Sequence, residues 1–245
     1  MTREQRLKRL RRSMLFVSAQ RPALLKDAYI FKPDSLLLDL EDAVAESQKD
    51  AARFSLYHAL QAVDYRGVER VVRINGLDTP HWQEDIRVAV AGGADMIRIA
   101  KCEKADDVRK VVRHIEQAEE AFGSEPGYTL VMAALESPLG ILNAYEICTA
   151  CPERMVGVAI AGGDFRKSMQ TKYYPGGLEM LGGRAMMLLA ARAAGVQCFD
   201  TVFTNLDDIE GFRVEVEQNK QMGFDGKSLI SPRQIAVVHE VFAPT

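Results

Sequence analysis

Two acidic residues stand where apolar segments of the sequence end. Glu136 follows the run TLVMAAL, and Asp164 follows VGVAIAGG. If these runs form neighbouring parallel strands, both carboxylates project into one mouth and repel each other. Magnesium relieves such repulsion, because it binds a few carboxylate oxygens and keeps water or substrate on its other positions. The pair therefore predicts a magnesium site, with helix capping or ion pairs to Arg98, Lys101 and Arg166 as the structural alternative.

An arginine inside one earlier apolar run and a group of acids at the end of another are further candidates. Arg73 lies inside the run RVVRIN, where an arginine needs a reason to be partly buried. Its planar guanidinium suits a carboxylate, which beside a metal indicates a 2-hydroxy or 2-oxo acid substrate; a structural ion pair is the alternative. Glu41 and Asp42, in the group from 39 to 42, are expected to hold metal-bound water. Glu41 is also a candidate general base.

Eight short apolar runs alternate with longer amphipathic segments along the chain. This alternation is typical of a parallel sheet covered by helices. The count of eight favours a (β/α)8 TIM barrel of the α/β class as a single domain over residues 1–245, with an open doubly wound sheet as the competing architecture. In a barrel, residues at strand ends lie at the C-terminal face, where chemistry is placed. The runs begin at Ser13, Ser35, Arg70, Asp95, Thr129, Val156, Val196 and Phe224.

Helical periodicity fills the intervals between these runs. Residues 48–62, 82–91, 105–121, 139–150, 178–194 and 206–222 are predicted to be helices. Left-handed C-terminal caps are expected at Gly92, Gly123, Gly195 and Gly223. The basic stretch from Arg3 to Arg12 is expected to be a solvated helix, and YYPGGLEMLGGR a mobile loop between the sixth strand and its helix.

Composition excludes several classes of function. The net charge is −3, from 31 basic and 34 acidic residues, which argues against a nucleic-acid partner. No apolar run reaches the roughly 18 residues of a membrane span, and no secretory signal is present, so we expect a cytoplasmic protein. The four cysteines lack CxxC spacing and are expected to be buried thiols. Neither a dinucleotide fingerprint nor a P-loop occurs.

Six motifs, in order along nearly the whole chain, together resemble one known family. They are RSMLFVSAQRPALL, LLLDLEDAV, VVRINGLDTP, LESPLGILNA, IAGGDF and MGFDGKSLISPRQI. The chain resembles the citrate lyase beta subunit group, which also contains malyl-CoA, citramalyl-CoA and related acyl-CoA lyases. The resemblance implies a magnesium-dependent enzyme that acts on an acyl-CoA, and family members are commonly trimers or hexamers.

The resemblance also implies roles for individual residues. Glu136 and Asp164 match the magnesium ligands, and Glu136 is expected to contact substrate as well. Arg73 matches the residue that contacts the substrate carboxyl. Phe16 and Arg21 match positions that approach the acyl-CoA ligand. Glu41, in LLLDLEDAV, matches the acid near the metal waters.

The implied reaction is cleavage of a 3-hydroxy-3-carboxyacyl-CoA. Citramalyl-CoA, split to pyruvate and acetyl-CoA, ranks first, and malyl-CoA or a citryl thioester ranks second. A metal-dependent aldolase of free 2-oxo acids and a non-catalytic subunit that binds CoA esters in a lyase complex stay open.

The chain departs from the family pattern at three places. Ser18 stands where the family has the proline of FVPA, and Ser231 where it has the histidine of IHPxQI. The sequence ends at VFAPT, where longer members continue into a C-terminal lid. We therefore expect a barrel without that lid, which favours cleavage over thioester hydrolysis.

Overall fold

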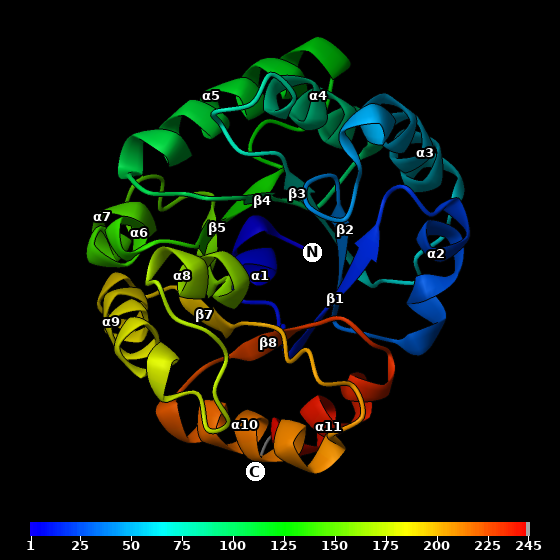
Figure 1. Ribbon diagram of the computed structural model, residues 1–245. Helices are drawn as coiled ribbons and strands as arrows, with labels where there is room; N and C mark the ends of the chain where they lie inside the picture. The colour runs from blue at the N-terminus through cyan, green and yellow to red at the C-terminus, as the bar shows by residue number, and fades with distance from the viewer. Residues whose placement is uncertain (244–245) are drawn as a thin grey trace.

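The computed structural model describes residues 1–243, and its eight strands close into a parallel barrel. Each strand pairs with the next along the chain, and β8 returns to β1. Figure 1 looks along the barrel axis, with the helices arranged as a ring outside the strands. The predicted TIM barrel is confirmed, and the open sheet is wrong. The strands are β1 (Ser13–Ser18), β2 (Ser35–Asp39), β3 (Glu69–Ile74), β4 (Met96–Ile99), β5 (Leu130–Leu135), β6 (Met155–Ile160), β7 (Gln197–Asp200) and β8 (Gly226–Leu229).

Five of the six predicted helices are confirmed, with small shifts at their ends. The helix expected over 139–150 is instead two short ones, because Asn143 leaves helical geometry (φ −92°, ψ 9°) and donates its side-chain amide to the carbonyl of Glu103. The helices are α1 (Arg3–Leu7), α2 (Pro22–Asp27), η1 (Ala28–Phe31), η2 (Glu46–Gln48), α3 (Lys49–Ala62), α4 (Trp82–Gly92), α5 (Ala105–Phe122), α6 (Pro138–Leu142), α7 (Ala144–Cys148), α8 (Gly162–Ser168), α9 (Leu178–Ala194), α10 (Ile209–Met222) and α11 (Arg233–Val241).

Two local predictions are corrected by these bounds. The left-handed cap of α4 is Gly93 (φ 83°), whereas Gly92 is the last helical residue and packs against Leu60. The other three predicted caps are confirmed. The segment YYPGGLEMLGGR is only partly a loop, because α9 begins at Leu178 within it and α8 precedes it.

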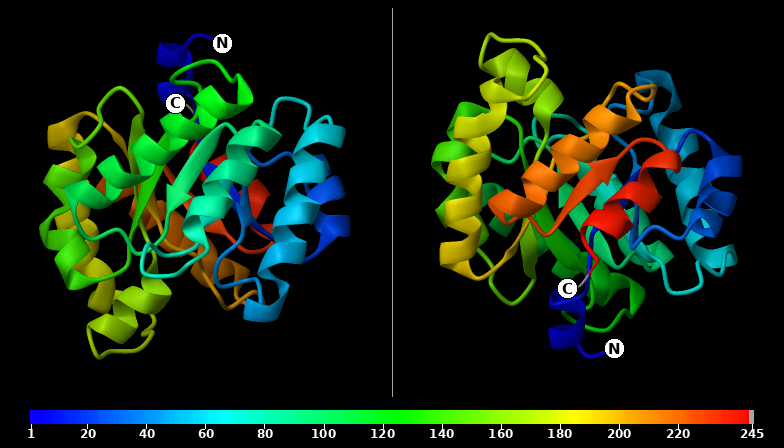
Figure 2. Two further views of the ribbon diagram at one scale, coloured as in Figure 1. Left: turned by 90° about the horizontal axis from the view of Figure 1, so that it is seen from above. Right: turned by 90° about the horizontal axis from the view of Figure 1, so that it is seen from below.

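The N-terminal basic stretch covers the end of the barrel at which the strands begin. Leu7 packs against the apolar barrel interior, and Arg6 donates to the carbonyls of Tyr128 (2.6 Å) and Asp95 (3.0 Å), which precede β5 and β4. Figure 2 shows α1 and α8 at opposite ends of the molecule. Arg11 is fully buried and paired with Glu69. The prediction of a solvated helix therefore holds for α1, which has no buried residue, and is wrong beyond it, because residues 9–12 are not helical and Arg11 is buried against Glu69.

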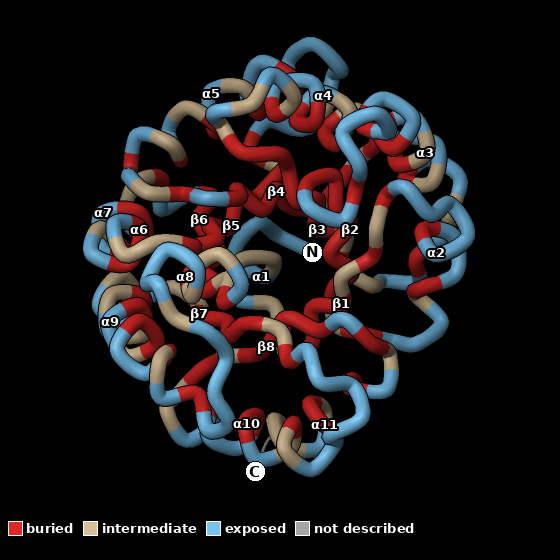
Figure 3. Tube along the Cα trace, viewed as in Figure 1, coloured by how far each residue is buried: buried red, intermediate tan, exposed pale blue. Residues whose placement is uncertain are grey.

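The core lies both inside the barrel and between the strands and the helix ring. Buried positions follow the strands, and exposed positions follow the outer helix faces (Figure 3). All four cysteines are buried and free, as predicted. No helix among residues 1–243 has the length and apolarity to cross a bilayer. The predicted lack of a C-terminal lid concerns the chain end, whose last two residues lie outside the described part.

A buried charge cluster joins β7 and β8 to the outer helices. Asp200 accepts hydrogen bonds from Arg184 Nε (2.8 Å) and Lys227 Nζ (2.6 Å). Burial by itself raises the pKa of Asp200, but these two cations outweigh it and lower the pKa from 3.8 to about 2. Ionised Asp200 therefore stabilises the fold above pH 3.8, and that contribution is lost as the pH falls toward 2.

We expect Asp200→Asn to lose this pH-dependent contribution, which is on the order of 2 kcal/mol. Urea unfolding of wild type and variant between pH 6 and pH 2.5 measures it. The difference between their free energies of unfolding is expected to shrink as the pH falls. A difference that stays constant across this range would show that Asp200 does not stabilise the fold through its charge.

Candidate active site

The C-terminal ends of the strands surround two hollows. The first is a cavity of about 600 Å³, and the second, of about 800 Å³, adjoins it through Glu136, Asp164 and Lys167, which line both. The barrel places chemistry at this face because parallel strands present their carboxyl ends on one side. Further groups that line the first cavity are Phe16, Asp39, Asp42, Arg73, Arg98, Thr201 and Ser228.

Arg73 forms the structural ion pair that the sequence left open. It lies opposite Asp39 in the register of β2 and β3, and its Nε and Nη2 donate to the two carboxylate oxygens of Asp39 at 2.6 and 2.7 Å. Burial raises the pKa of Asp39, but Arg73 outweighs it and the pKa is lowered. The guanidinium still lines the cavity, and Nη1 is the nitrogen that Asp39 does not hold; it is ion-paired with Glu41 Oε2 at 2.8 Å, so a ligand would share it with Glu41.

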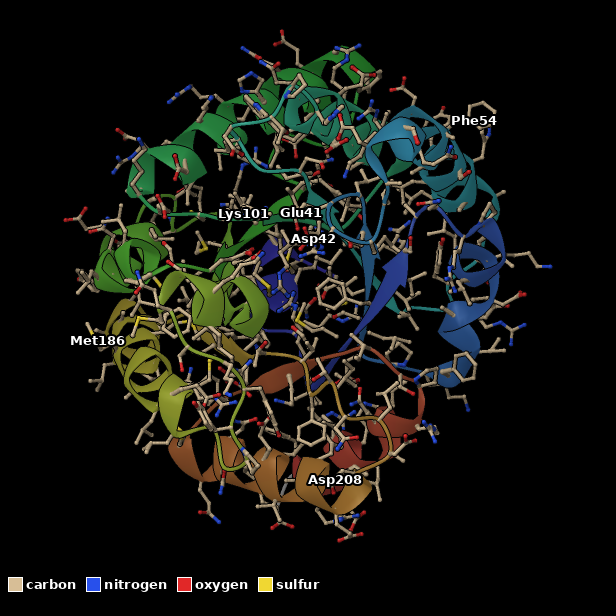
Figure 4. The ribbon with its side chains drawn as sticks, in the orientation of Figure 1. Glu41, Asp42, Phe54, Lys101, Met186 and Asp208 are labelled. Atoms are coloured by element: carbon tan, nitrogen blue, oxygen red, sulfur yellow. The ribbon has the colours of Figure 1, made fainter. Side chains whose placement is uncertain are left out.

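Glu41 lies beside the cavity in a network of cations. Its buried carboxylate pairs with Arg73 and with Lys101 Nζ (2.8 Å). Burial raises the pKa of Glu41, although Arg73 and Lys101 oppose the rise. Figure 4 shows Glu41, Asp42 and Lys101 gathered at the barrel mouth. Asp42 lines the first cavity, whereas Glu41 lines neither hollow.

Glu136 is a buried carboxylate that faces the cavity from the end of β5. It is 4% exposed, and Oε1 accepts the backbone N–H of Lys101 at 3.0 Å. Lys101 has a left-handed backbone (φ 51°), which a residue with a side chain seldom adopts. Burial raises the pKa of Glu136 to about 7, and the nearby charge of Glu41 adds to the rise. A cation beside Glu136 would offset this cost of burying its charge.

Asp164 brings a second carboxylate to the same hollows from the first turn of α8. There it lies 3.2 Å from Lys167 Nζ, and its charge suits the helix N-terminus. The ion pairs proposed as a structural alternative are wrong, because Lys101 pairs with Glu41 and Arg166 with Glu179. No cluster of three or more metal-ligating side chains occurs in residues 1–243. Two carboxylate ligands suit magnesium, because magnesium keeps several bound waters and does not require a site closed by protein ligands.

Of the two residues expected to approach the acyl-CoA, one lines the cavity and the other does not. The Phe16 ring lines the first cavity, with the guanidinium carbons of Arg73 and Arg98 at 4.9 and 5.5 Å from its centroid. Arg21 precedes α2, is exposed and lines neither hollow. Its role stays a prediction.

Sequence reasoning missed Arg98 as a residue of the site. Arg98 is 1% exposed, lines the first cavity and lies opposite Arg73 in the register of β3 and β4. The signal was available, since Arg98 interrupts the apolar run DMIRIA as Arg73 interrupts its own run. The sequence indicates Arg98 only as an ion-pair partner of Glu136 or Asp164, but Arg98 forms no ion pair with a carboxylate in the described chain.

Comparison with known proteins gives the family. The family described as HpcH/HpaI aldolase/citrate lyase matches residues 12–232. The chain belongs to this family. The resemblance seen in the sequence is thereby confirmed, and the protein is a carbon–carbon lyase.

One sequence relative and two solved structures show what this chain is similar to. "Citrate lyase subunit beta" of Leuconostoc mesenteroides subsp. cremoris is 52% identical over 237 residues, which are 97% of this chain and 78% of the relative. The citrate lyase beta subunit of M. tuberculosis, solved with oxaloacetate and magnesium, superposes with a TM-score of 0.81 at 30% identity, over 97% of this chain and 99% of that one. A structure of Mycobacterium tuberculosis CitE with magnesium, acetoacetate and coenzyme A gives 0.80 at 29% identity, over 96% and 82%.

Proposed function

We propose that this lyase depends on magnesium and cleaves a citryl thioester to oxaloacetate and an acetyl thioester. The observation that carries the proposal is the convergence of Glu136 and Asp164 on a cavity that also holds Arg73. The citrate lyase names and the oxaloacetate and magnesium of the relatives support this choice of substrate. Citramalyl-CoA, ranked first from the sequence, stays an untested prediction.

The residues that line the first cavity would have separate roles in cleavage. Glu136 and Asp164 would hold the magnesium, which when bound polarises the hydroxyl and carboxylate oxygens of the substrate. Arg73 would bind that carboxylate through Nη1, because Asp39 occupies Nε and Nη2 and fixes the plane of the guanidinium. Asp39 is therefore a positioning residue.

Cleavage requires that the substrate hydroxyl lose its proton. Glu41 is the proposed acceptor, directly or through one water, since its carboxylate lies beside the cavity rather than on its wall. The hydroxyl-bearing carbon then becomes a ketone as its bond to the neighbouring methylene breaks. The electron pair of that bond passes to the methylene, giving the enolate of the acetyl thioester, which takes up a proton.

The second hollow suits the carrier arm of the thioester. Four lysines line it together with five acids, of which Glu136 and Asp164 belong to the reaction cavity as well and Asp78, Glu103 and Asp107 do not. Ammonium groups bind phosphates such as those of coenzyme A, and the hollow meets the reaction cavity at Glu136 and Asp164. The lysines are Lys101, Lys104, Lys110 and Lys167.

A direct assay tests the proposed function. Purified protein is incubated with citryl-CoA, citramalyl-CoA or malyl-CoA, with magnesium or with EDTA, and the released 2-oxo acid and acetyl-CoA are measured. We expect magnesium-dependent release of oxaloacetate and acetyl-CoA from citryl-CoA. Absence of turnover with all three substrates, in folded protein that binds magnesium, would contradict the proposal and favour the non-catalytic subunit.

A further inference from the structure

Arg98 differs from other buried arginines of this protein because it has no acidic ion-pair partner among residues 1–243. A buried guanidinium without a carboxylate costs free energy. Within residues 1–243, Arg98 Nη1 donates to the hydroxyl of Ser228 at 3.1 Å, and its Nε is buried with no hydrogen-bond partner. Four other buried arginines each hold a carboxylate in two hydrogen bonds: Arg11 with Glu69, Arg73 with Asp39, Arg154 with Glu119 and Arg184 with Asp200.

The position of Arg98 directs this unpaired charge into the reaction cavity. Its neighbour in β5 is Met132, which belongs to the apolar barrel interior, so the side chain of Arg98 points inward. The guanidinium reaches Ser228 on β8. It also faces the ring of Phe16, which Arg73 approaches as well. Two guanidiniums therefore line the cavity, and among the described residues Arg73 is ion-paired with an acid whereas Arg98 is not.

The charge of Arg98 indicates which kind of ligand the cavity binds. A ligand with a single carboxylate, held at Arg73 and the Glu136–Asp164 pair, would leave Arg98 buried without a hydrogen-bonded anion, its charge offset only in part by the nearby carboxylates. A second carboxylate on the ligand would neutralise Arg98 and engage its unused N–H groups. The environment of Arg98 strengthens this selection. Burial is the larger cause and repulsion from Arg73 the next, and together they lower the pKa of Arg98 to about 10. An anion beside Arg98 would offset both effects.

We propose that Arg98 is a specificity-determining residue that binds a second carboxylate of the substrate. The site then selects thioesters whose hydroxyl-bearing carbon carries both a carboxylate and a carboxymethyl arm, and it disfavours those with a methyl group or hydrogen in place of that arm. This inference rests on the proposed function and adds the residue that distinguishes a dicarboxylate 2-oxo acid product from a monocarboxylate one.

The variant Arg98→Met tests the proposal by binding rather than by turnover. Wild type and variant are titrated calorimetrically with freshly dissolved oxaloacetate and with pyruvate, in magnesium. We expect the variant to lose roughly 10- to 100-fold in affinity for oxaloacetate, the value of a charge-assisted hydrogen bond. Its affinity for pyruvate is expected to change much less, so the preference of the wild type for oxaloacetate should disappear.

The outcomes separate this inference from the function on which it rests. If the wild type binds both acids and Arg98→Met weakens both equally, the second-carboxylate role of Arg98 is wrong while the lyase proposal stands. If the wild type binds neither acid with magnesium, the proposed function itself fails. Arg98→Lys keeps the charge without the planar fork, and is expected to retain part of the preference for oxaloacetate.

Thermal unfolding without ligand shows whether Arg98 has a structural role instead. Arg98→Met is expected to leave the melting temperature unchanged or to raise it, because it removes a buried charge that has no acidic partner. The matched control Arg184→Met should lower it, since it strands Asp200, which Arg184 holds through Nε and Nη2. An equal fall in both variants would overturn the proposal by making Arg98 a structural arginine.

Discussion

Glu136→Gln is expected to reduce magnesium-dependent cleavage by on the order of 10³-fold or more while preserving the fold. The amide keeps the shape of the side chain but removes the negative charge that would hold the metal. Burial raises the pKa of Glu136 to about 7, so its charge is costly in the absence of a cation. Without magnesium, the variant should therefore be at least as stable as the wild type.

Two measurements check this expectation. Steady-state cleavage gives the loss of kcat, and the rise in melting temperature on adding magnesium, present in the wild type, should vanish in Glu136→Gln. Glu146→Gln, an exposed acid on α7, is the matched control and should behave as the wild type. Unaltered magnesium dependence in Glu136→Gln would remove Glu136 from the metal site.

Arg73→Lys is expected to lower kcat/KM by roughly 10- to 100-fold. An ammonium cannot hold both oxygens of Asp39 and also present a donor to the substrate, as the guanidinium can through Nη1. The free energy of unfolding should also fall by up to about 3 kcal/mol, because Asp39 is fully buried and loses its bidentate partner.

Asp39→Asn separates the two roles of Arg73. This variant keeps the guanidinium but removes its paired charge, so we expect a loss of stability with a smaller rise in KM than Arg73→Lys causes. Urea unfolding and steady-state kinetics of both variants provide the comparison. An unchanged KM in Arg73→Lys would mean that Arg73 supports Asp39 and the strand ends without contacting substrate, whereas equal increases would mean that its contact depends wholly on the pair with Asp39.

The sequence determined the fold because its signal is local and repeated. Each apolar run, such as SLLLDL from Ser35, is bounded by a helical pattern, and eight such units leave few ways to bury the strands. The same rule placed Arg73, Glu136 and Asp164 at one face, since the carboxyl ends of parallel strands meet there. The break at Asn143 was not visible, because a hydrogen bond to Glu103, forty residues earlier, decides it.

Only the tertiary structure decided which charges neutralise each other. Asp39 and Arg73 are separated by 34 positions in the chain, yet the register of their strands places them side by side, and the guanidinium of Arg73 donates to the carboxylate of Asp39. The same register sets Arg98 beside Arg73 without an acid of its own. Sequence reveals that an arginine interrupts an apolar run, but not its partner. Pairing depends on distances across the barrel, which exist only once the strands have closed.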